Sequence, residues 1–161
     1  MDISVKQYLE RAENELRVST ILKNLSESNS EEKANLGGRK EDTFYSSVIS
    51  HAYYAIFYSA KAILLSKNIE TDAPEVHKKT LEEFKKHFVD SGILDLELLK
   101  IYNEMIVRAD ELLGLYQIEK SKRGRFVYKT IPQANVEPAE ESIAHAKKFV
   151  SHIKQIIEGE V

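Results

Sequence analysis

The sequence contains no cysteine and few of the residues that interrupt regular structure, with 6 glycines and 3 prolines in a chain of 161 residues. Without cysteine the protein can form no disulfide, no thiol nucleophile and no cysteine-ligated zinc site. This fits a reducing compartment, and we expect a cytoplasmic protein. Sparse glycine and proline favour long helices over many short strands. The length fits one domain, which we predict to span residues 1–161.

The motifs of several common active sites are also missing. The sequence has no P-loop, no G-x-G-x-x-G fingerprint, no G-x-S-x-G elbow and no H-E-x-x-H zinc motif. Its histidines include no i, i+4 pair, and His145 and His152 lie two helical turns apart, as surface polar residues often do. Paired acids such as Glu140-Glu141 fit solvated helix faces. We therefore predict no metal site and no cofactor.

Strong overall charge is absent too. The net charge is −3, so any attraction to nucleic acid or to a membrane must be local. The first residues, MDISVKQYLERAENEL, have mixed charge and lack the apolar core of a signal peptide.

A run without Asp, Glu, Lys or Arg extends from Thr43 to Ala60, and we predict that it forms a central helix over residues 43–68. A helix that is apolar on most sides must be covered on most sides. The run is also the one membrane candidate, but its serines, His51 and Lys61 make a poor spanning helix, and we predict no membrane segment. Its two apolar rows are Phe44, Val48, Ala52, Ile56, Ala60 and Ile63, and Tyr45, Ile49, Tyr53, Phe57 and Leu64.

Amphipathic patterns around this run predict four further helices. The first begins at a Ser4-x-x-Gln7 capping box. The helix after the central one begins at Asp72, with Pro74 in its first turn, and stops at Gly92. The predicted ranges are about 4–25, 72–91, 98–116 and 137 onward. Five helices without an alternating strand pattern predict an all-α bundle.

Two polar segments interrupt the helices. Residues 26–40 are polar throughout, so we predict a loop, which is either a plain surface loop or a lid or partner-contact segment. Residues 118–136 form a basic loop, with a short extended excursion before the last helix. Its cations and rings are typical of single-stranded nucleic-acid binding, while the alternative is a soluble loop whose rings fold onto the core. Its candidate contacts are Lys120, Lys122, Arg123, Arg125 and Tyr128.

Three further residues are candidate ligand contacts. Arg108 either pairs with Glu104, four residues before it, or binds an anion in a groove. His51 and Tyr54 on the central helix need hydrogen-bond partners if they are buried. Either these are bonds between helices that fix the register of the bundle, or the side chains line a cleft.

Stretches in this order resemble the HEPN domain family, in its small stand-alone branch. SHAYYAIFYSAKAILL, from Ser50 to Leu65, resembles the signature of the family's second helix. VRAD, from Val107 to Asp110, resembles its arginine motif, and the stretch from Phe126 to Val150 resembles its last helix. The resemblance implies an antiparallel bundle that forms a homodimer. It also implies a minimal nucleotidyltransferase as partner, in a toxin–antitoxin or defence system.

Many members of that family are metal-independent RNases that use an arginine followed, after four to six residues, by a histidine. Here no histidine follows Arg108 in that window; Gly114 takes one of the allowed positions, and Tyr116 falls where some members carry a tyrosine that the partner modifies. The strongest general base at neutral pH is therefore missing, and Arg108 and Tyr116 are the remaining catalytic candidates. We predict a module that binds RNA, a nucleotide or a partner rather than an enzyme. The alternatives are an endoribonuclease with a rearranged site and a dimerising scaffold.

Overall fold

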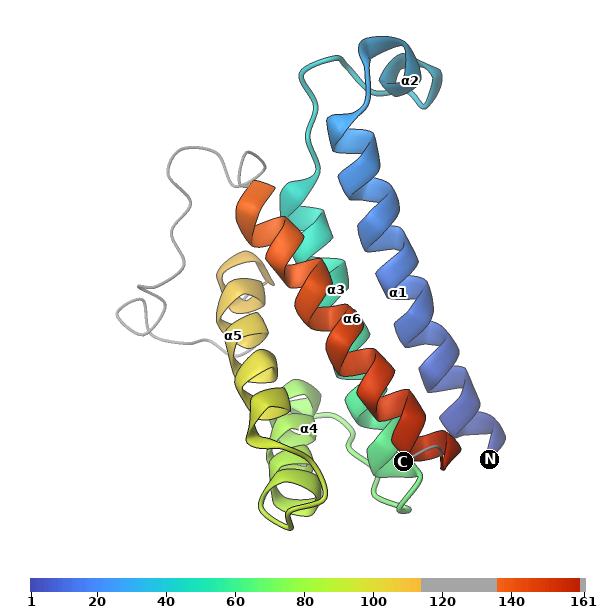
Figure 1. The fold of residues 1–161 in the computed structure, drawn as a ribbon, viewed down its shortest axis with the longest axis vertical. Coiled ribbons are helices and arrows are strands. Elements are labelled where there is room, and N and C mark those ends of the chain that lie inside the picture. Colours follow the sequence, from blue (N-terminus) through green and yellow to red (C-terminus); the bar gives the residue numbers. More distant parts are fainter. Residues whose placement is uncertain (114–135, 160–161) are drawn as a thin grey trace.

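The computed structural model describes residues 1–113 and 136–159, which form helices joined by loops (Figure 1). No strand occurs within these residues, which confirms the predicted all-α class. The elements are α1 (Ile3–Glu27), α2 (Ser30–Asn35), α3 (Tyr45–Leu65), α4 (Val76–Phe84), a π-helical turn η1 (Lys85–Val89), α5 (Leu96–Leu113) and α6 (Val136–Glu158).

Helix α3 is the central element, and it contacts α1, α4, α5 and α6. In Figure 1, α1 rises from the N-terminus, α3 descends behind α6, α5 rises beside α6, and α6 descends again. The long helices that follow one another along the chain therefore run antiparallel. Both chain ends lie at the same end of the bundle (Figure 1).

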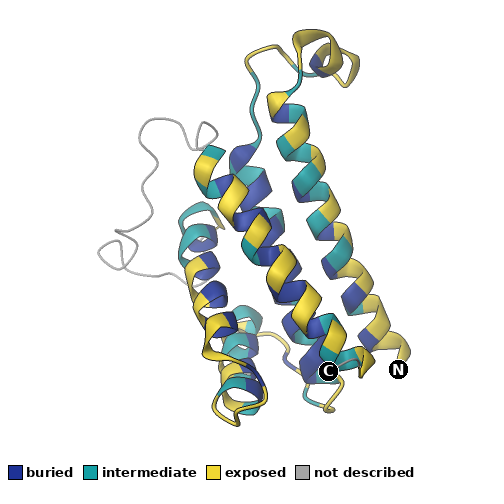
Figure 2. Ribbon diagram, viewed as in Figure 1, coloured by how far each residue is buried: buried dark blue, intermediate teal, exposed yellow. Residues whose placement is uncertain are grey.

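The two predicted rows of α3 form the core. Val48, Ile56 and Ile63 each expose at most 1% of their surface. Figure 2 shows the matching pattern on α1 and α6, whose outward strips are exposed and whose inward strips are buried. Within the described residues α3 is the one helix long and apolar enough to cross a membrane, but 67% of its apolar window is buried inside the protein. The structure thus places α3 as the core helix of the bundle.

Three rings join α4, α5 and α6 next to that core. Phe84, Tyr102 and Phe149 are all fully buried, and their ring centroids lie 5.4–5.5 Å apart. Tilted and edge-on ring pairs at this spacing add to the free energy gained by burial. This ring cluster fixes α5 and α6 side by side.

The predicted capping box at Ser4, at the start of the first helix, is wrong. The Asp2 carboxylate accepts the Ser4 N–H at 2.7 Å, so Asp2 is the N-cap and Ser4 already lies inside α1. An aspartate oxygen satisfies an orphan amide as well as a serine hydroxyl does, and it adds a negative charge at the positive end of the helix.

The predicted loop over residues 26–40 is also partly wrong, because it contains the short helix α2. The Asn29 side chain accepts the Glu32 N–H at 2.9 Å, which is a cap three residues before a glutamate. Lys33 is buried, and its Nζ donates to the Lys40 carbonyl at 3.0 Å. These contacts fold the segment back on itself.

Helix α4 begins at Val76, not at Asp72 as predicted. Glu75 adopts a left-handed conformation, with φ 57°, which breaks the helix before Val76. The segment before Glu75 is held in place by Lys61 Nζ, which donates to the Thr71 carbonyl at 2.8 Å. The predicted stop at Gly92 is confirmed, with φ 80° at that glycine. The last turn before it is π-helical rather than α-helical.

Candidate functional site

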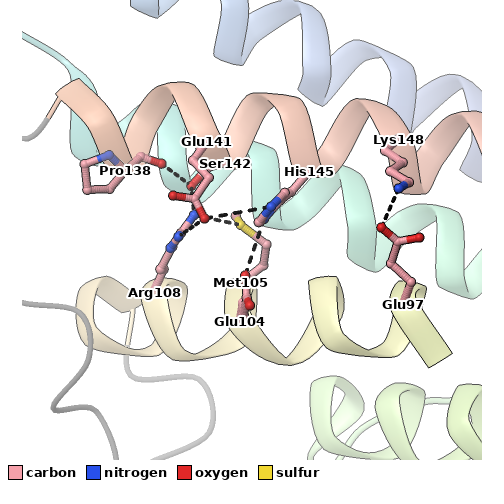
Figure 3. A network of polar contacts seen from close by, with 9 residues as sticks. All are labelled: Glu97, Glu104, Met105, Arg108, Pro138, Glu141, Ser142, His145 and Lys148. Carbon is pink, nitrogen blue, oxygen red and sulfur yellow. Dashed lines mark hydrogen bonds and ion pairs between the residues drawn. The ribbon is translucent and has the colours of Figure 1, made fainter.

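Arg108 lies between α5 and α6, and only 13% of its side chain is exposed (Figure 3). Its Nη1 donates to the Ser142 hydroxyl at 3.2 Å, and its Nη2 donates to Glu141 Oε1 at 2.7 Å. Ser142 is buried and donates in turn to the Pro138 carbonyl at 2.6 Å. The guanidinium is therefore oriented by the first two turns of α6.

An imidazole also lies between two carboxylates where α5 and α6 face one another. His145 Nε2 lies 3.8 Å from Glu141 Oε1, and His145 Nδ1 lies 3.6 Å from Glu104 Oε2. Figure 3 shows Glu104 and Arg108 reaching from α5 toward Glu141, Ser142 and His145 on α6. We call these five residues the α5–α6 polar cluster.

This arrangement corrects one predicted pair. Among the described residues Glu104 of α5 faces His145 of α6, while Arg108 of α5 pairs with Glu141 of α6. Arg108 and Glu104 lie one turn apart on α5, but the facing helix offers Arg108 both a hydroxyl and a carboxylate. Glu141 and His145 were expected as plain surface residues. Their i, i+4 spacing is the signal that could have placed them on one face of α6.

His51 connects α3 to α1. Its Nδ1 lies 2.5 Å from Glu15 Oε2, and Glu15, which is buried, also accepts from Arg11 Nε at 2.9 Å. His51 thus makes a contact between helices of the kind that fixes bundle register. A ligand role for His51 stays a prediction.

Tyr54 is half-buried and packs among rings. Its ring stacks with Tyr58 at 6.1 Å and lies edge-on to His77 at 6.0 Å. Burial raises the pKa of the Tyr54 hydroxyl. A ligand role for Tyr54 also stays a prediction, and neither Tyr54 nor His51 belongs to the α5–α6 polar cluster.

His77 is a half-buried residue whose environment the sequence did not reveal. Its ring stacks on Phe57 at 4.2 Å, and its Nδ1 lies 2.7 Å from the Tyr53 hydroxyl. Burial lowers the pKa of His77, and the ammonium of Lys61 lowers it further. The folded protein therefore favours a neutral imidazole, which shares a hydrogen bond with the Tyr53 hydroxyl.

We expect this histidine to make the protein less stable in acid. Below about pH 6.5, the ordinary histidine pKa, the unfolded chain binds a proton that folded His77 does not, so the free energy of unfolding falls as the pH drops through that value. In His77→Gln this contribution is lost, and the decrease between about pH 7.5 and pH 5 becomes smaller. Urea unfolding of the wild type and of His77→Gln at both pH values measures this decrease. Equal decreases in both proteins would rule out His77 as the source.

The remaining predicted site residues lie outside the described part of the chain. They are Tyr116, Lys120, Lys122, Arg123, Arg125 and Tyr128, together with the extended excursion before α6. Arg108 lies five residues before Leu113, the last described residue of α5, so the basic segment follows, in sequence, the helix that carries this arginine.

Comparison with known proteins adds the following. A family profile described as "HEPN domain" matches residues 5–156. The protein named "Putative toxin MJ0605" of Methanocaldococcus jannaschii is 32% identical over 117 residues, which cover 73% of this chain and 74% of the relative. "Putative toxin MJ0142" of the same organism is 41% identical over 61 residues, or 38% of this chain and 40% of the relative. A "UPF0332 protein" of Thermotoga maritima is 30% identical over 112 residues, or 70% and 72% of the two chains.

Proposed function

Because the chain belongs to the HEPN domain family, we propose that it is a toxin-like module that binds RNA or a nucleotide, with Arg108 as the phosphate contact. The module acts as a single domain in the cytoplasm. It works as a homodimer together with a minimal nucleotidyltransferase, and the basic residues 120–129 extend the contact with the nucleic-acid backbone.

The position of Arg108 is the observation that carries this proposal. Its guanidinium is anchored by the buried hydroxyl of Ser142, whereas its acidic partner Glu141 has 51% of its side chain exposed. Ion pairs with an exposed partner contribute little free energy, so a ligand can displace Glu141 at small cost. A phosphate offers the guanidinium two parallel charge-assisted bonds in its place. Arg108 thus stays oriented while its anion is exchanged.

Binding of a short fluorescent single-stranded RNA, followed by anisotropy, tests the proposal. We expect saturable binding whose affinity falls steeply as salt is raised, since phosphate contacts release counterions. Absence of binding at low salt would reject RNA as the ligand, and a nucleoside triphosphate would then be titrated in the same assay. The change expected for an Arg108 variant is argued in the Discussion.

RNA cleavage is a second candidate, and one observation favours it. His145 on α6 is a candidate for the imidazole that is missing after Arg108 in the sequence, because it shares the Glu141 carboxylate with Arg108. A histidine can move the proton of a ribose hydroxyl while an arginine neutralises the phosphate. Incubation of the RNA with the protein in EDTA tests this metal-independent cleavage. Cleavage that is lost in both Arg108→Ala and His145→Ala supports the enzyme, and intact RNA with the wild type supports the binding module.

A further inference from the structure

The α5–α6 polar cluster contains three groups that metal ions commonly bind. Glu141 and His145 lie one turn apart on α6, and Glu104 faces them from α5. One ligand atom from each of the three lies within 4.8 Å of the other two. Residues four apart on a helix lie on the same face, so Glu141 and His145 can reach one ion together with Glu104 from the facing helix.

His145 Nδ1 gives an independent reason to look for a ligand at this point. The atom is shielded from solvent and makes no hydrogen bond within the described residues. Its distance to Glu104 Oε2, 3.6 Å, is too long for a hydrogen bond. Buried polar atoms almost always have a partner, so an exception calls for an explanation.

We propose that Glu104, Glu141 and His145 bind a divalent transition-metal ion, with zinc as the best fit. Zinc takes nitrogen and oxygen ligands at about 2.0–2.2 Å, which places the ligand atoms of a tetrahedral site roughly 3.4 Å apart. The separation of His145 Nδ1 from Glu104 Oε2 is close to that value, at 3.6 Å. Both carboxylates are exposed. Glu141 Oε1 lies 3.8 Å from the other ring nitrogen, Nε2, so the Glu141 side chain has to rotate to reach an ion on Nδ1. Three protein ligands leave a fourth position for water.

The site shares Glu141 with Arg108. Glu141 Oε1 accepts from Arg108 Nη2 at 2.7 Å, so the guanidinium repels the ion and competes for the same carboxylate. Zinc binding and the Arg108–Glu141 pair therefore oppose one another. The inference does not rest on the proposed function, because it concerns only these three ligands and the ion. Bound zinc would also occupy the imidazole that the cleavage candidate needs.

Calorimetric titration of the full chain with zinc chloride, in a buffer without phosphate, tests the site. We expect one zinc per chain, with affinity lowered about tenfold or more in Glu104→Gln and in His145→Ala, since even groups around a metal ligand change affinity by that much. Replacement of Arg108 by Gln should raise the affinity, because a competing charge is removed. Glu104 is exposed, so its variant is expected to fold whatever happens to His145→Ala.

His87→Ala is the matched control. His87 Nε2 lies 2.9 Å from Glu83, one turn earlier, so it repeats the Glu–His spacing of α6. Within the described residues no third ligand completes that pair. We expect wild-type zinc affinity in this variant. Wild-type affinity in both Glu104→Gln and His145→Ala, an equal loss in His87→Ala, or no zinc bound by the wild type would each overturn the proposal.

Discussion

Replacing Arg108 with alanine is expected to weaken the binding of single-stranded RNA by roughly 10- to 150-fold. A hydrogen bond to a charged group contributes about 1.5–3 kcal/mol, and about 1.4 kcal/mol corresponds to a tenfold change in affinity. Arg108 should sit near the upper part of this range because its guanidinium is positioned before the ligand arrives, by the buried Ser142. Anisotropy titrations at one fixed salt concentration measure the change.

Two further variants serve as controls for Arg108→Ala. Arg17→Ala removes an exposed arginine of α1, and we expect a change of less than about threefold, as for an ordinary surface charge. Arg108→Lys keeps the charge but loses the planar fork, so its affinity should lie between those of the wild type and Arg108→Ala. Equal affinities of Arg108→Ala and Arg17→Ala, in variants that unfold at the wild-type temperature, would remove Arg108 from the binding site.

The largest effect on stability is expected from Ile56→Ala in the middle of α3. Ile56 is fully buried in the helix that contacts α1, α4, α5 and α6, so its truncation leaves a cavity in the core. Such truncations cost about 2–5 kcal/mol of unfolding free energy, which is a large share of the total for a domain of this size. Urea unfolding followed by circular dichroism measures it.

Ile21→Ala makes the same chemical change at the surface. Ile21 is 60% exposed on α1, and we expect a change within about 0.5 kcal/mol. The difference between the losses of unfolding free energy in Ile56→Ala and Ile21→Ala therefore separates the effect of burial from that of helix propensity. A loss below about 1 kcal/mol in Ile56→Ala would contradict the central position of α3.

The fold was predictable because α3 combines two signals in one stretch. The run from Thr43 to Ala60, most of which lies in α3, has no charge over 18 residues, and both of its apolar rows keep helical spacing, which together require a helix that is covered on several sides. Val48 and Ile63, which lie about four turns apart in one row, are both buried as that argument demands. The start of α4 was not predictable in the same way. The left-handed Glu75 follows a segment tethered by Lys61, and a contact across the fold leaves no local pattern.

The candidate site was predictable only in part. The sequence singled out Arg108, but the one protein partner that it suggested was Glu104 on the same helix, as one of two alternatives. The actual partners, Glu141 and Ser142, lie 33 and 34 residues away in sequence. Which residues of α6 face α5 depends on the rotation of each helix about its axis, and this is set by the buried rings between them. Periodicity gives the apolar face of each helix, but it does not give the register of two polar edges.

The NMR signal of the Arg108 guanidinium tests most directly the claim that Arg108 binds the phosphate of RNA. In a proton–nitrogen NMR spectrum of the labelled protein, the side-chain signal missing from Arg108→Ala identifies this group. Titration with single-stranded RNA is expected to shift that signal saturably, with the same dissociation constant as anisotropy, because phosphate replaces Glu141 as its acceptor. An Arg108 signal that stays unchanged while the RNA saturates the protein would place the binding site elsewhere.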